Sequence, residues 1–117
     1  MTISDTILVT GGAGFIGSNF VLQWIDAHAP VINLDLITYA GNPENLASLS
    51  GNSAHRLVQG DICNAQLIGK LLSEARPRAI VHFAAESHVD RSITAPDAFI
   101  RTNVEGTFTL LEQARRY

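Results

Sequence analysis

Cysteine and basic residues are scarce in this sequence. Its 117 residues include one cysteine, Cys63, which cannot form a disulfide within the chain. We interpret Cys63 as a small core or loop residue of a protein from a reducing compartment, with nothing to support thiol catalysis. The 8 lysines and arginines, against 11 acids and with a formal net charge of −3, form no basic stripe, which argues against a nucleic-acid partner.

Long apolar runs and clustered metal ligands are also missing. The longest apolar stretches are interrupted by glycine or proline far short of a membrane span, and residues 1–5 carry no basic leader, so we expect a cytoplasmic protein without a membrane partner. His28, His55 and His82 have no other ligand side chains around them and indicate no metal site. With 46% hydrophobic and 16% charged residues, the chain fits one soluble globular domain.

A glycine-rich turn follows the first apolar run. Residues 10–17 read Thr-Gly-Gly-Ala-Gly-Phe-Ile-Gly, between Ile7-Leu8-Val9 and a helical pattern. Gly11, Gly14 and Gly17 allow a sharp exit from a buried strand, close approach of backbone N–H groups to a pyrophosphate, and tight helix packing. The alternative is a tight turn of purely structural use. Because strand and helix are both readable, the pattern favours a dinucleotide site at a helix N-terminus.

Asp35 supplies the acidic residue that such a site requires about 20 positions later, at the end of the second apolar run. A carboxylate there accepts hydrogen bonds from the adenosine ribose and repels a 2'-phosphate. Leu36 and Ile37 add no positive charge, so the sequence predicts NAD rather than NADP as the cofactor. The alternative is that Asp35 is a simple turn residue.

Strands and helices are predicted to alternate, without repeats or an interdomain linker. The predicted strands are residues 6–10, 31–34, 56–59 and 79–83, and helical patterns precede Pro30 and Pro77. Phe20 and Trp24 belong to the first of these helices and are expected in the core. Pro43 is expected to open a short helix. Right-handed crossovers give a Rossmann-type α/β fold, a doubly wound parallel sheet of order 3-2-1-4 with ligands at the carboxyl ends of its strands.

Two further segments fall at that edge. After the third strand, Asp61 is expected to accept from the adenine amino group while Ile62 covers the ring, although Asp61 could instead cap the helix that begins near Asn64. After the fourth strand comes Ala84-Ala85-Glu86-Ser87.

The last helix is expected after Pro96 with Asp97 as N-cap. Ile100, Val104, Phe108 and Leu111, with Thr107 and Ala114, are expected to face the sheet, which leaves Phe99, Leu110 and Tyr117 for a second surface. No glycine or proline ends this helix before Tyr117. We therefore expect the chain to be the N-terminal part of a NAD-binding domain in a longer enzyme.

These segments carry a resemblance. The chain resembles the extended short-chain dehydrogenase/reductase family and, within it, the dTDP-glucose 4,6-dehydratases. The resemblance rests on residues 10–17, on Asp35 with Thr38-Tyr39-Ala40-Gly41-Asn42, and on Ala-Ala-Glu-Ser-His-Val-Asp-Arg-Ser-Ile at 84–93. Position 36 departs from it, since Leu36 stands where lysine is expected, which puts only a surface contact to the adenosine in doubt.

The resemblance implies a role for each site residue. Phe15 and Ile16 contact the diphosphate, Asp35, Leu36, Ile37 and Thr38 hold the ribose, and Asp61 and Ile62 hold adenine. Ala84, Ala85 and Glu86 line the nicotinamide, Ser87 meets the sugar nucleotide, and Thr102 closes on the cofactor. His88 is expected to be structural rather than a general base, and Asp90 and Arg91 to anchor their loop.

The resemblance also implies the reaction: oxidation of dTDP-glucose at C4 by NAD, loss of water across C5 and C6, and reduction at C6. Its Tyr-x-x-x-Lys pair and acidic pair lie beyond Tyr117, so this chain is expected to hold no catalytic residue and to be inactive alone. A homodimer built on the last helix is implied for the parent. A 4-epimerase or another 4,6-dehydratase of nucleotide sugars remains an alternative, as does a non-catalytic nucleotide-binding module.

Overall fold

The computed structural model describes residues 2–27, 30–37, 43–85 and 93–117. Within these ranges the strands are β1 (Ile7–Thr10), β2 (Val31–Asp35), β3 (His55–Gln59) and β4 (Ala79–His82). All pair in parallel in one sheet of order β3-β2-β1-β4, with Ile7 opposite both Val31 and Ala79. The predicted strand order and the Rossmann-type fold are confirmed.

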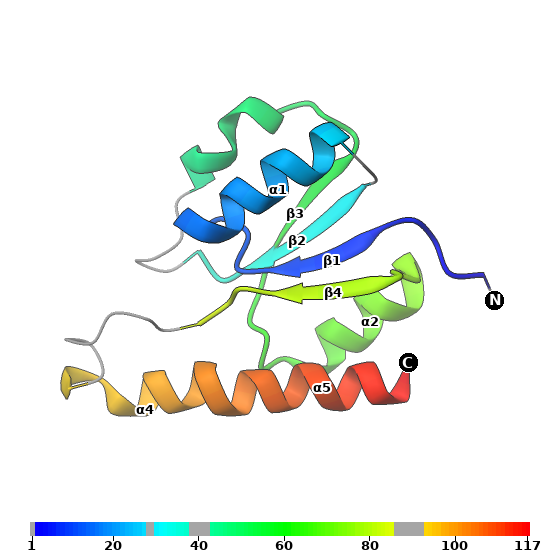
Figure 1. Cartoon of the computed structure of the whole chain (residues 1–117). Coiled ribbons are helices and arrows are strands. Elements are labelled where there is room, and N and C mark those ends of the chain that lie inside the picture. The colour runs from blue at the N-terminus through cyan, green and yellow to red at the C-terminus, as the bar shows by residue number, and fades with distance from the viewer. Residues whose placement is uncertain (1, 28–29, 38–42, 86–92) are drawn as a thin grey trace.

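Helices cover both faces of the sheet (Figure 1). α1 (Phe15–Ala27) and the 3-10 helix η1 (Pro43–Leu49) lie on one face, and Pro43 opens η1 as predicted. α2 (Ala65–Ala75) lies on the other face, beside a long helix made of α4 (Pro96–Ile100), the π-helical η2 (Arg101–Gly106) and α5 (Thr107–Arg116). None of the helices in the described ranges has the length and apolar character to cross a bilayer.

The core consists of two layers because successive strand residues point to opposite faces. Ile7 and Val9 of β1 pack with Val21 of α1 and Leu49 of η1, whereas Leu8 packs with Ile68 of α2 and its neighbours. Phe20 and Trp24 stack at a centroid distance of 5.7 Å and border the first layer, as expected of core residues. The central strands β1 and β2 are therefore buried throughout, while β3 is a partly exposed edge.

The predicted orientation of the last helix is wrong. Leu110 is the buried residue, 4% exposed and packed in the layer beneath α2, whereas Phe108 is 66% exposed. Ile100, Val104 and Leu111 are exposed with Phe108, and we call these four residues the apolar stripe. The prediction placed these four residues on one face and turned that face to the sheet, whereas the helix meets the rest of the fold through Gly106, Thr107 and Leu110.

The N-caps of α4 and α2 bear on two predictions from the sequence: the N-cap of α4 differs from the predicted residue, and the N-cap of α2 decides between two roles for Asp61. Asp97 is not the N-cap of α4: Ala95 holds that position without a side-chain cap, and Asp97 lies in the first turn, where its charge still suits the helix dipole. Asn64 caps α2 by accepting from the backbone N–H of Leu67 at 3.1 Å. The capping alternative for Asp61 is thereby removed.

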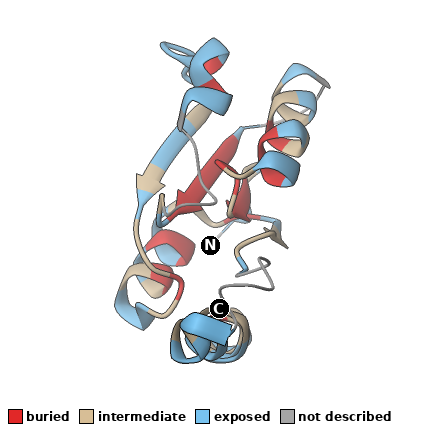
Figure 2. Cartoon of the chain, turned by 90° about the vertical axis from the view of Figure 1, so that its left-hand side faces the viewer, coloured by how far each residue is buried: buried red, intermediate tan, exposed pale blue. Residues whose placement is uncertain are grey.

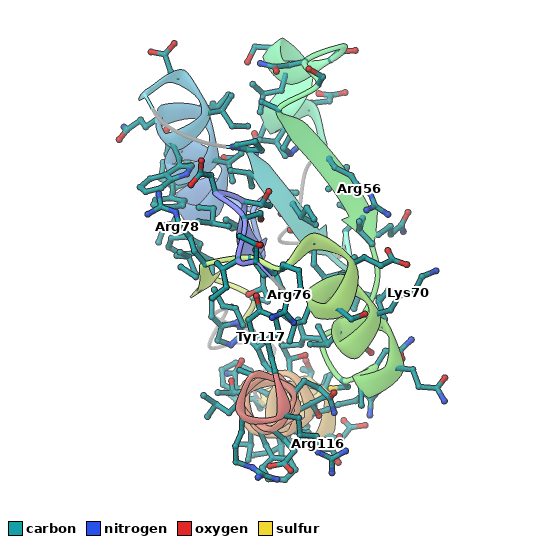
Figure 3. The ribbon with its side chains drawn as sticks, turned by 90° about the vertical axis from the view of Figure 1, so that its right-hand side faces the viewer. Arg56, Lys70, Arg76, Arg78, Arg116 and Tyr117 are labelled. Atoms are coloured by element: carbon teal, nitrogen blue, oxygen red, sulfur yellow. The ribbon has the colours of Figure 1, made fainter. Side chains whose placement is uncertain are left out.

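The end of α5 is tied to the amino edge of the sheet (Figure 3). The hydroxyl of Tyr117 donates to the carbonyl of Pro77 at 2.8 Å, and the guanidinium of Arg76 lies 4.6 Å from the centre of the Tyr117 ring. In the same view Arg78 lies on the side of α1, over the ring of Trp24, and Arg56 lies on the opposite side, at β3.

Candidate functional site

The glycine turn between β1 and α1 is built for close backbone contact. Gly11 has φ +72°, and a Cβ there would lie 2.5 Å from the backbone nitrogen of Ala84. The turn therefore needs glycine for its own conformation and also to make room for the backbone that follows β4. A Cβ on Gly17 would overlap the carbonyl oxygen of Gly11. The N–H of Gly14 donates to that same carbonyl at 3.3 Å. The turn therefore folds back directly onto the start of α1.

The first residues of α1 are open to solvent. Phe15 is 80% exposed and Ile16 is also exposed, and the helix begins at Phe15 as the glycine pattern predicts. The unpaired backbone N–H groups and the positive end of the helix dipole therefore point out of the turn. This arrangement suits an anionic diphosphate.

Asn33 and Gly12 support the turn from below, and sequence analysis missed both. Asn33 is fully buried in β2, and its Oδ1 accepts from the backbone N–H of Gly12 at 3.0 Å. A Cβ on Gly12 would overlap the Asn33 carboxamide, so this glycine is a steric requirement as well. The signal was present in the sequence as a polar residue inside the apolar run of β2.

Asp35 joins the turn to the loop after β2. Its carboxylate is 8% exposed: Oδ2 accepts from the N–H of Ala13 at 2.8 Å and Oδ1 from the N–H of Ile37 at 2.7 Å. Ile37 has φ +57°, a strained conformation for a β-branched residue, of the kind that concentrates at ligand sites. An ionised carboxylate has about four acceptor positions, so each oxygen retains one for a further donor. Asp35 thus acts as a turn residue and remains able to bind a hydroxyl pair.

Asp61 stands at the corresponding place after β3. Its Oδ1 accepts from the N–H of Cys63 at 2.8 Å, and its Oδ2 accepts from Nη2 of Arg101 at 3.2 Å. Burial alone raises the pKa of Asp61, but the Cys63 N–H and the Arg101 guanidinium outweigh it, and the pKa lies below its ordinary value. Asp61 is therefore an anion with free acceptor positions at neutral pH.

The two neighbours of Asp61 have different surroundings. Ile62 is 5% exposed and packs in the core layer with α2, so the expectation that its side chain covers an adenine ring is wrong; only its backbone is available at the edge. Burial, and then the charge of Asp61, raises the pKa of the Cys63 thiol. The thiol is therefore protonated at neutral pH.

A polar chain holds the beginning of the loop after β4. The N–H of Ala84 donates to Oγ1 of Thr10 at 3.3 Å, Thr10 contacts Nδ1 of His82, and Nε2 of His82 lies 3.1 Å from Oγ1 of Thr107. Burial lowers the pKa of His82, so the ring is neutral at pH 7 and links β1, β4 and α5. Thr107 faces the sheet as the sequence predicted, but its contact with His82 and the part of Thr10 in this chain were not predicted.

The structure brings most of the predicted site together. The glycine turn, Asp35 to Ile37, Asp61 with Ile62, and Ala84 with Ala85 all follow the carboxyl ends of paired strands, on the side that faces the viewer in Figure 2. Leu36 is 47% exposed there, and Thr102 is half-buried in η2. Some predicted positions lie outside the described residues: His28, Thr38, Glu86, Ser87, His88, Asp90 and Arg91. Within the described residues there is no cluster of three or more histidine, cysteine or acidic side chains that could hold a metal ion.

Comparison with known proteins decides the family. The family model for GDP-mannose 4,6 dehydratase matches residues 8–117. The chain belongs to this family. A dTDP-glucose 4,6-dehydratase of Xanthomonas campestris pv. campestris (strain B100) is 59% identical over 112 residues, which cover 96% of this chain and 32% of that protein.

Solved structures of family relatives superpose closely. A dTDP-glucose 4,6-dehydratase from Streptomyces venezuelae, crystallised with NAD and TYD, is 53% identical with a TM-score of 0.86 and covers 93% of this chain and 35% of its own. A UDP-glucose 4-epimerase from Thermotoga maritima, solved with UDP-glucose, is 35% identical with a TM-score of 0.86. The match covers 96% of this chain and 34% of the epimerase chain. The chain thus spans about a third of the length of these family relatives. The similarity of this chain to the dTDP-glucose 4,6-dehydratases confirms the resemblance seen in its sequence.

Proposed function

We propose that this chain is the NAD-binding part of a dTDP-glucose 4,6-dehydratase. The observation that carries the proposal is the pair of carboxyl side chains, Asp35 and Asp61, at the ends of neighbouring strands and beside the exposed N-terminus of α1. A dinucleotide offers donors and an anion in that arrangement: ribose hydroxyls, an adenine amino group and a diphosphate.

The residues divide the cofactor between them. The N–H groups of Phe15 and Ile16 bind the diphosphate, Asp35 to Thr38 hold the adenosine ribose, and Asp61 with the Ile62 backbone binds adenine. Ala84, Ala85 and Glu86 line the nicotinamide, with Ser87 towards the sugar nucleotide and Thr102 closing on the cofactor. The polar chain from Thr107 to Ala84 supports this division, because it fixes the backbone at the nicotinamide end.

The chemistry also requires an acid and a base in addition to the cofactor. NAD, when bound, supplies a hydride acceptor for C4 of the hexose and returns the hydride at C6 after water is lost. An acid and a base must each reach their proton within hydrogen-bond distance. We place these residues beyond Tyr117, and the 117 residues provide cofactor binding alone.

The parent protein is proposed to be a cytoplasmic homodimer. The apolar stripe supports the dimer, since four large apolar side chains on one helix face solvent together, and grouped apolar exposure of this kind is typical of an interface.

Product analysis tests the reaction. The complete protein should convert dTDP-glucose to a 4-keto-6-deoxy sugar whose mass is lower by one water, detected by chromatography with mass spectrometry. A 4-epimerase, the alternative favoured by the similarity to the Thermotoga maritima structure, changes the retention of UDP-glucose without changing its mass. The isolated 117-residue chain should show no turnover with either sugar, and any product formed by it would contradict the placement of the catalytic residues.

A further inference from the structure

Three consecutive residues of the β3 to α2 loop are held by one helix segment. Arg101, the first residue of η2, contacts Asp61 and Cys63, and Gly106, its last residue, lies against Ile62. η2 is π-helical, and π-helical turns within longer helices often occur at functional sites. None of these contacts entered the sequence analysis or the proposed function.

Arg101 makes two of the contacts. Its guanidinium Nη2 donates to Oδ2 of Asp61 at 3.2 Å, and its backbone carbonyl lies 3.4 Å from Sγ of Cys63. A second guanidinium nitrogen, Nη1, pairs with Glu105 at 3.1 Å on the same helix. The side chain is thus held between an acid of its own helix and an acid of the loop.

Gly106 fixes the distance between the helix and the loop. A Cβ at position 106 would overlap Cδ1 of Ile62, so the helix backbone sits directly against the buried isoleucine side chain. Ile62 cannot shift towards the helix, and Asp61 next to it is oriented by Cys63 on one oxygen and by Arg101 on the other.

We infer that Arg101 is a positioning residue for adenine, which acts by fixing the Asp61 carboxylate so that a free acceptor position meets the 6-amino group. This inference rests on the proposed NAD site. Without Arg101, the Asp61 carboxylate would keep its contacts with the backbone N–H and the thiol of Cys63 but would lose the partner that fixes Oδ2. Arg101 therefore contributes to the choice of base rather than to general affinity.

The test compares two cofactors that differ on one edge of the base. Nicotinamide hypoxanthine dinucleotide carries a carbonyl oxygen in place of the adenine 6-amino group and a proton on N1, so at position 6 it offers the Asp61 carboxylate an acceptor instead of a donor. The ratio of the two dissociation constants, measured by calorimetry, reports this contact. Wild type should prefer NAD, and Arg101→Gln should reduce that preference about two- to fivefold, the range of an exposed charge pair. Arg101→Lys, which keeps a cation, should restore part of it.

Glu105→Gln is the matched control. It removes the other ion pair of Arg101 on the exposed helix surface and leaves the contact with Asp61, so the cofactor preference should equal that of wild type. Thermal melts of each variant check that the fold is retained.

The outcomes separate the inference from the proposed function. An unchanged preference in Arg101→Gln, or an equal loss of both affinities, overturns the inference and leaves NAD binding intact. A wild type that binds both cofactors equally overturns the adenine contact of Asp61 and the inference with it. A wild type that binds neither refutes the proposed function itself.

Discussion

Replacing Asp35 by alanine removes two kinds of contact, one to the cofactor and one within the fold. In the cofactor site the carboxylate accepts from ribose hydroxyls, and in the fold it accepts from the N–H groups of Ala13 and Ile37. A variant therefore has to be judged by a quantity that depends on the first function alone.

The magnitudes follow from these contacts. Hydrogen bonds to a charged acceptor contribute about 1.5–3 kcal/mol, so Asp35→Ala should weaken NAD about 10- to 100-fold. The same change leaves two backbone donors without their acceptor, at a cost of about 1–3 kcal/mol each if they stay shielded from water. That loss is a large part of the roughly 5–15 kcal/mol that stabilises a domain. Asp35→Asn, which keeps one acceptor oxygen, serves as the milder variant.

Calorimetric titration with NAD and with NADP gives the decisive ratio. Both ligands are measured on the same folded population, so partial unfolding cancels from the ratio of their dissociation constants. Wild type should prefer NAD, and both Asp35 variants should lose most of that preference because the 2'-phosphate no longer meets a carboxylate.

Asn45→Ala provides the control for the turn. Asn45 donates to the carbonyl of Ala13 at 3.0 Å, so its removal should lower stability by about 1 kcal/mol and leave the NAD to NADP ratio unchanged. Equal or tighter binding of NADP by wild type would refute the assignment of Asp35. So would an Asp35→Ala variant that loses affinity for both cofactors by the same factor.

Two further predictions concern association and pH. Phe108→Glu places a charge in the apolar stripe and should convert a dimer or larger assembly into a monomer, as measured by sedimentation. Ile3→Glu, at an exposed apolar residue outside that helix, is the control and should not change the assembly. A monomeric wild type would contradict the dimer. Burial lowers the pKa of His55 and His82, so the unfolded chain takes up protons first; the free energy of unfolding should hold above pH 6.5 and decline as the pH falls below it. Urea titrations at pH 7.5 and 5.5 should show this decline, and a smaller one in His82→Gln, while greater stability at pH 5.5 would contradict it. The depressed pKa of Asp61 acts in a separate window, below its ordinary value of 3.8.

The sheet and its ligand edge were predictable because local signals agreed with one another. The first apolar run ended at Gly11 and the second at Asp35, and each of the four predicted strands matches an observed strand within one residue at either end. Gly11 and Gly17 proved to be required by close backbone approach, which is the reason for which the pattern uses glycine.

What escaped prediction depends on contacts between distant residues. The apolar residues of the last helix were expected to face the sheet, but the helix packs through Gly106 on Ile62 and through Thr107 on His82, so Leu110 is buried and Phe108 is exposed. The side chain of Ile62 packs in the core against Gly106, although its position next to Asp61 suggested a role in covering adenine. Asn33 was readable as a polar residue in an apolar strand, but its partner, Gly12, is set by the tertiary fold.

Backbone NMR of the labelled 117-residue chain during titration with NAD tests the central claim most directly. The cofactor is predicted to shift the amide signals of Gly11 to Gly17, Asp35 to Ile37, Asp61 to Cys63, and Ala84, all at the carboxyl edge of the sheet. Signals of the amino edge, including Arg76 and Arg78, should stay in place. Shifts confined to that opposite edge, or no shifts at saturating NAD, would contradict the account.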